Sequence, residues 1–98
     1  MGSKATKSSP IPLTGDLDIF SIQAQWAGLK GQLPAGGTVV LDLSGVGDLD
    51  LSGCQLLASA QRRVQDGGGK LTLQGLSEEA ARRLRDLGFK DLVGEAAP

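Results

Sequence analysis

Histidine is absent from this chain, and cysteine occurs only once, at Cys54, among its 98 residues. Without histidine the chain has no Ser–His or Cys–His nucleophile pair, no histidine phosphotransfer site and no imidazole ligand for a transition metal. One cysteine cannot form an internal disulfide. We therefore expect no enzymatic activity, no metal and no cofactor, and a reducing cytoplasm as the setting.

The chain also lacks an excess of charge and a long apolar run. Ten basic residues face eleven acidic ones, which gives a formal net charge of −1. This balance does not resemble the electrostatic surface of a nucleic-acid-binding protein. No charged-then-apolar leader and no membrane-length span is present, so we expect neither secretion nor insertion into a membrane. Proteins or small molecules are left as the expected partners.

At this length the sequence predicts one small domain, over residues 10–95, after a Ser-, Lys- and Thr-rich tail at residues 1–9. The first extended segment, at residues 10–13, contains two prolines and so belongs at the edge of a sheet. From Asp16 the pattern becomes helical, with Asp18 or Ser21 as the N-cap. Apolar residues at helical spacing mark the buried side of this helix: Ile22, Trp26, Leu29 and Leu33.

Two further strands and two helices follow. The apolar run at residues 38–43 predicts a central strand covered on both faces, and the alternation at residues 70–74 predicts a half-buried strand. Helical stripes lie between these strands, up to a stop at residues 67–69, and after Ser77 as N-cap, up to Gly88. This order predicts an α/β sandwich, with helices packed against a small, mostly parallel sheet.

The segment from Val39 to Leu57 carries the candidate site. An apolar strand gives way to an acidic, glycine-containing loop and then to a helix, and Ser52 lies at the start of that helix. A helix N-terminus offers unpaired N–H groups and a partial positive charge, which tolerate an anion or a phosphoryl group. Ser52 is therefore a candidate phosphorylation site, although a serine at this position is also a common structural N-cap.

Other chemistry in this segment is less well supported by spacing. Asp48, Asp50 and Ser52 resemble the first half of a calcium loop, but Ser59 stands where the bidentate glutamate is needed. The same Asp-x-Asp resembles an aspartyl phosphatase with Asp48 as nucleophile, although that motif follows its strand directly. Cys54 is either a thiolate activated by the helix start or a buried apolar residue, and burial is favoured.

The order of residues from Leu41 to Leu57 resembles the signature loop of STAS domains, the family of bacterial anti-sigma-factor antagonists and sulphate-transporter tails. The resemblance rests on Leu-Asp-Leu-Ser-Gly-Val at 41–46, Leu-Asp-Leu-Ser-Gly at 49–53 and Gln-Leu-Leu at 55–57. It extends to residues 13–18, 69–73 and 83–89, which resemble the family's second strand, its next strand after the signature helix, and its last helix.

This resemblance implies a non-catalytic interaction module. A serine kinase that is also the anti-sigma factor would phosphorylate Ser52, and the modification would expel this partner. The expected partner surface surrounds Ser52 and consists of Asp48, Asp50, Leu51, Gly53 and Cys54. Two alternatives remain: a constitutive adaptor in a chemotaxis or lipid-transport assembly, and the small aspartyl phosphatase.

Overall fold

The computed structural model describes residues 10–33 and 36–94, which form three strands and four helices. In chain order these are β1 (Ile11–Leu17), α1 (Ile22–Lys30), β2 (Thr38–Leu49), α2 (Leu51–Asp66), β3 (Lys70–Gln74), α3 (Glu78–Asp86) and α4 (Lys90–Gly94). The predicted α/β architecture is confirmed. The predicted tail at residues 1–9 and the last residues, 95–98, lie outside the described residues.

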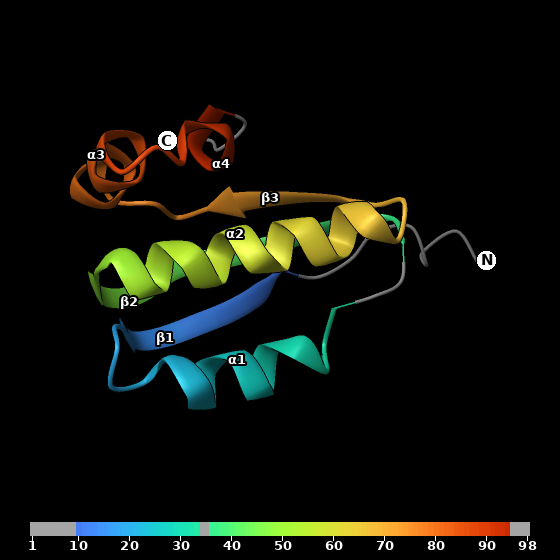
Figure 1. Cartoon of the computed structure of the whole chain (residues 1–98), viewed down its shortest axis with the longest axis horizontal. Coiled ribbons are helices and arrows are strands. Elements are labelled where there is room, and N and C mark those ends of the chain that lie inside the picture. Colours follow the sequence, from blue (N-terminus) through green and yellow to red (C-terminus); the bar gives the residue numbers. More distant parts are fainter. Residues whose placement is uncertain (1–9, 34–35, 95–98) are drawn as a thin grey trace.

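The strands form one parallel sheet in the order β1-β2-β3. β2 is the central strand, and the proline-containing β1 is an edge strand, as the sequence predicts. Each strand leads into a helix at its carboxyl end, so α1 and α2 start at the same edge of the sheet and run in the same direction (Figure 1). The segment from Asp50 onward therefore lies at the carboxyl edge of the central strand.

The helices cover one face of the sheet, which corrects the expectation that the central strand is covered on both faces. Along β2, Val39, Leu41 and Leu43 are buried, whereas Val40 and Asp42 between them are only partly buried. The same alternation runs along β3. In Figure 1, α2 lies across the front of the sheet. The apolar core is closed between these inward residues and the helices.

The acidic segment predicted as a loop is instead the second half of β2. Thr14 pairs with Gly45 and Leu17 with Leu49, so the strand continues far beyond Leu43. The register shifts twice, and at each shift β2 carries one more residue than β1. Glycine allows such bulges because it has no side chain to hinder the close approach of the neighbouring strand: a Cβ on Gly45 would lie 3.0 Å from the Cγ2 of Thr14.

Two helix boundaries also differ from the prediction. Asp16 and Leu17 belong to β1, because they continue its pairing with β2, and α1 begins only at Ile22. At the other end, the chain continues past Gly88 into the short helix α4. Gly88 has a φ of +94°, a backbone conformation that interrupts the helix and that residues with a side chain rarely adopt.

The start of α2 packs directly on β1 through Gly53. This glycine is buried, and a Cβ on it would collide with the carbonyl oxygen of Leu17 and lie 2.7 Å from the Cβ of Leu17. It would also lie 2.8 Å from the Cδ1 of Leu49. Helix and strand can approach this closely only because position 53 has no side chain.

Replacing this glycine tests the contact. We expect Gly53→Ala to lower the free energy of unfolding by at least about 1–3 kcal/mol, because α2 must shift to accommodate the methyl group. The matched control is Gly28→Ala in α1, where a Cβ would meet nothing within 4 Å. This control should be neutral or stabilising, by up to about 1 kcal/mol. Urea unfolding measures both values, and an equal effect of the two substitutions would contradict the contact.

Candidate functional site

Ser52 is the second residue of α2 and lies just past the carboxyl end of the central strand, as the sequence predicts. A single residue, Asp50, separates the end of β2 from the start of α2. The Ser52 side chain is partly buried. The short connection through Asp50 places Ser52 at the carboxyl edge of the sheet, where the ligands of open α/β sheets usually bind.

The N-cap of α2 is Asp50, so the interpretation of Ser52 as a structural cap is wrong. The Oδ1 of Asp50 accepts a hydrogen bond from the N–H of Gly53 at 3.1 Å, and its carbonyl oxygen accepts from the N–H of Cys54 at 2.9 Å. This geometry is a regular N-cap, and it needs nothing from the Ser52 hydroxyl. The hydroxyl of Ser52 is therefore free of a capping role.

Asp50 also joins α2 to the turn between β1 and α1. Its Oδ2 accepts a hydrogen bond from the N–H of Ile19 at 3.3 Å, and its own N–H donates to the carbonyl oxygen of Leu17 at 3.2 Å. In the strands just before this junction, the Oδ1 of Asp16 in β1 accepts a hydrogen bond from the N–H of Asp48 in β2 at 2.9 Å. Aspartate side chains thus connect the ends of β1 and β2, and the carboxylate of Asp50 is committed to this structural role.

Ser52 faces an open groove between α1 and α2. This part of the groove has a volume of about 480 Å³ and is lined by Ile19, Ile22, Gln23, Trp26, Ser52, Gln55, Leu56 and Ser59. None of these lining residues carries a charge. Ile19 is 61 % exposed, and its neighbour Phe20 is 93 % exposed. The surroundings of Ser52 are therefore more apolar than the acidic sequence around it indicates.

Leu51 faces a different opening, between α2 and α3. That groove, of about 460 Å³, is lined by Asp50, Leu51, Glu79, Arg82, Arg83, Asp86 and Leu87. Leu51 and Leu87 are 49 % and 42 % exposed, so two apolar side chains lie there among charged ones. Two consecutive residues of α2 thus serve two separate surfaces.

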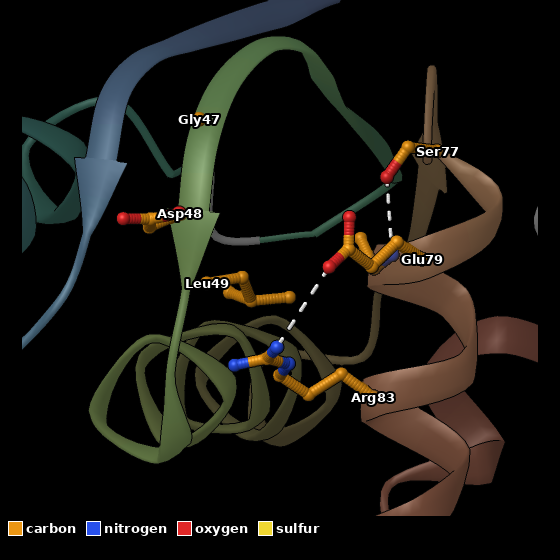
Figure 2. Close-up of a pocket in the computed structure, with 7 residues that line it drawn as sticks. Gly47, Asp48, Leu49, Ser77, Glu79 and Arg83 are labelled. Carbon is orange, nitrogen blue, oxygen red and sulfur yellow. Dashed lines mark hydrogen bonds and ion pairs between the residues drawn. The ribbon is translucent and has the colours of Figure 1, made fainter.

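Asp48 belongs to neither groove. It lines a small cavity of about 50 Å³ between the end of β2 and the start of α3 (Figure 2). Across this cavity, Ser77 caps α3 by accepting from the N–H of Ala80 at 3.0 Å, and Arg83 lies 4.0 Å from the carboxylate of Glu79. The structure therefore does not place Asp48 in the same opening as Ser52.

Gly53 and Cys54, the other residues predicted to contact a partner, lie beneath the site. Both are buried, and Cys54 has no exposed surface. Burial raises the pKa of the Cys54 thiol above its ordinary value of 9.0, an effect that Arg83 partly opposes. An activated thiolate at this position is therefore disfavoured.

The sequence reasoning missed Ile19 and Phe20. These two large apolar residues directly follow Asp18, whose Oδ1 accepts from the N–H groups of Phe20 and Ser21 in a tight turn. The available signal was Phe20, which lies outside the helical stripe in a polar turn, whereas Ile19, three residues before Ile22, falls on the stripe itself. Ile19 lines the opening next to Ser52, and Phe20 follows it on the exposed turn.

Two further observations concern the residues that the structure describes, 10–33 and 36–94. Within these ranges no three His, Cys, Asp or Glu residues gather closely enough to hold a metal ion. The helices that the structure describes are too short or too polar to cross a bilayer.

The double role of Asp50 predicts a graded loss of stability. We expect Asp50→Ala to lower the free energy of unfolding by about 1–2 kcal/mol, because it removes the cap of α2 and the bond to Ile19. Asp50→Ser should cost less, because serine can still cap the helix. Asp48→Ala is the control, and it should stay within about 0.5 kcal/mol of the parent chain. If urea unfolding gives equal losses of the free energy of unfolding for Asp48→Ala and Asp50→Ala, the structural role assigned to Asp50 is wrong.

The burial of Cys54 predicts an unreactive thiol. With its pKa raised and its sulfur enclosed, Cys54 should react with an aromatic disulfide reagent at neutral pH only when the chain unfolds. The measured rate should therefore rise with urea in parallel with unfolding. Rapid reaction of the native chain at neutral pH would show that the thiol is accessible.

Comparison with known protein families matches residues 3–94 to the family described as "Mlab, STAS domain". Comparison with curated proteins gives no match. The family match spans nearly the whole chain, and the parallel sheet with its packed helices is consistent with a STAS-like fold. The chain therefore belongs to the STAS domain family.

Proposed function

We propose that this chain is a non-catalytic interaction module of the anti-sigma-factor-antagonist kind, whose binding to a partner protein is switched by phosphorylation of Ser52. The observation that carries the proposal is the placement of Ser52: its hydroxyl has no capping role, and it borders an uncharged, largely apolar groove. STAS domains are generally non-catalytic, which favours binding over chemistry.

The start of α2 tolerates the added charge. A phosphoryl group brings about −1.5 to −2 charges at neutral pH. Asp50 already accepts from Gly53, and Cys54 donates to the Asp50 carbonyl, which leaves the N–H groups of Leu51 and Ser52 outside the helix's own bonding. These groups and the helix dipole favour an anion here, so the fold survives the modification.

The same charge is incompatible with an apolar partner surface. A side chain that packs on Ile22 or Trp26 beside Ser52 would have to strip water from a phosphoryl group, and burial of an unpaired charge is costly. The described residues that line this part of the groove include no cationic side chain to compensate. Expulsion of the partner therefore follows from desolvation as much as from repulsion.

The test compares Ser52→Asp with Ser52→Asn, which has nearly the same size but no charge. The partner is a candidate serine kinase of the anti-sigma-factor type, purified and titrated with each variant. We expect Ser52→Asp to weaken binding at least about tenfold relative to Ser52→Asn, which corresponds to about 1.4 kcal/mol. Both variants should unfold at the same urea concentration as the parent chain.

Phosphate transfer provides the second measurement. Incubation with ATP and the kinase should add one phosphoryl group, located at Ser52 by mass spectrometry, and Ser52→Ala should abolish it. Phosphorylation elsewhere, or equal affinity of the Asp and Asn variants, would contradict the switch. Loss of binding that merely parallels unfolding of Ser52→Asp would contradict it as well.

A constitutive adaptor is the second candidate, and the exposed Leu51 favours it. Leu51 and Leu87 form an apolar contact surface in the α2–α3 groove that does not include Ser52. A partner bound there would be insensitive to the charge at position 52. In that case Leu51→Ala would weaken binding, while Ser52→Asp would not.

A further inference from the structure

The groove beside Ser52 continues along the full length of α2. A second opening, of about 560 Å³, is lined by Trp26, Leu33, Ser59, Arg62, Arg63, Asp66 and Gly67. Trp26 and Ser59 line both openings, which makes them one surface, here named the α1–α2 groove. It extends from the first turn of α2 to its last, about 24 Å at 1.5 Å per residue.

The chemistry of the α1–α2 groove changes from one end to the other. The end at Ser52 is uncharged, whereas Arg62 and Arg63 line the opposite end together with Asp66. Both arginines are exposed, and in the part of the chain that the structure describes neither forms an ion pair. The groove thus offers an apolar half and a half with net positive charge.

We propose that the α1–α2 groove binds one amphipathic helix of a partner protein. The apolar side chains of this helix lie over Ile22, Trp26 and Leu56, and acidic side chains at one of its ends meet Arg62 and Arg63. α1 and α2 run in the same direction (Figure 1). The α1–α2 groove follows the length of α2, so a third helix can lie along it. Charge complementarity selects an acidic rather than a basic helix end.

This inference deepens the proposed function and rests on it for the premise that the chain binds a protein. It adds the class of partner segment and a second contact region, remote from Ser52 along α2. The Ser52 switch and the helix-binding groove can fail separately, because one is tested at position 52 and the other at positions 59, 62 and 63.

The probe is a displayed library of stapled helical peptides of about four turns, the length of α2. Apolar residues occupy one face of each peptide, and the terminal turns are randomised. Selection against the full chain should enrich peptides with Asp or Glu in one terminal turn. Trp26 is the only tryptophan and the chain has no tyrosine, so its fluorescence reports on the groove itself. Bound peptides should shift that emission to shorter wavelength.

Charge reversal at Arg62 and Arg63 tests whether the acidic end of a bound peptide lies against these two arginines. Arg62→Glu with Arg63→Glu should weaken the selected peptides at least about tenfold, and a peptide with lysines in place of the acidic residues should recover affinity for this variant. The matched control is Arg85→Glu with Lys90→Glu, two exposed cationic residues outside both the α1–α2 and the α2–α3 groove. This control should leave affinity unchanged.

A bulky charged side chain at the centre of the α1–α2 groove tests whether the partner helix binds there, and it leaves the core residues unchanged. Ser59 is exposed and lines both openings, so Ser59→Glu should weaken binding at least about tenfold. Gln65→Glu adds the same charge to an exposed position of α2 outside the groove and should have no effect. Unfolding in urea should be the same for both variants.

Several results would overturn the proposal. These are a library without enriched binders, binders that tolerate Ser59→Glu, or enrichment of basic terminal turns. Sedimentation of the chain alone could also contradict the proposal. If the chain forms a dimer that Ser59→Glu dissociates, the groove binds a second copy of this chain and not a partner's helix. None of these results bears on whether phosphorylation of Ser52 weakens a partner.

Discussion

The contact between Gly53 and Leu17 positions every other part of the site. A helix that starts this close to a strand needs a residue without a side chain, and it also needs its first N–H groups satisfied in a crowded place. Asp50 meets part of the second need, since its Oδ1 accepts from the N–H of Gly53 and its carbonyl oxygen from the N–H of Cys54. Its Oδ2 accepts from the N–H of Ile19 in the turn after β1. The start of α2 is thereby fixed to the end of β1 and to the turn that follows it. The placement of Ser52 and the width of the α1–α2 groove both depend on this junction.

Much of this arrangement follows from the sequence, because the core is made by regular periodicity. The stripe of α2 and the alternation of β3 identify the buried residues correctly, whereas in the stripe predicted for α1 only Leu29 is buried, and Ile22, Trp26 and Leu33 are partly buried. Prolines at positions 10 and 12 correctly indicate an edge strand. What periodicity cannot predict is the second half of β2, where two bulges break the alternation and the glycines look like turn residues. There the pairing partner, β1, decides the structure, and it is distant along the chain.

The candidate site, like the fold, can be predicted only in part from the sequence. The position of Ser52 at a helix start follows from local pattern, whereas the identity of the cap and the separation of the two grooves do not. Consecutive helical residues point about 100° apart, so Leu51 turns toward α3 and Ser52 toward α1. Whether each groove is apolar or charged then depends on the neighbouring helix. Near Ser52 in the sequence, the carboxylate of Asp50 caps α2 and Asp48 lines a separate cavity, and only the folded chain defines both placements.

This separation decides how a phosphoryl group on Ser52 would act. The arginines nearest the start of α2 along the α2–α3 groove, Arg82 and Arg83, do not line the opening that Ser52 faces, and Arg83 is paired with Glu79. Among the residues that the structure describes, no side-chain cation lines the opening at Ser52 to draw a phosphoryl group away from the α1–α2 groove. The backbone N–H groups at the helix start would favour its position at the groove's apolar end instead. The modification would therefore change a binding surface without repacking the domain, because the groove is already open and the core beneath it, at Gly53 and Cys54, is closed.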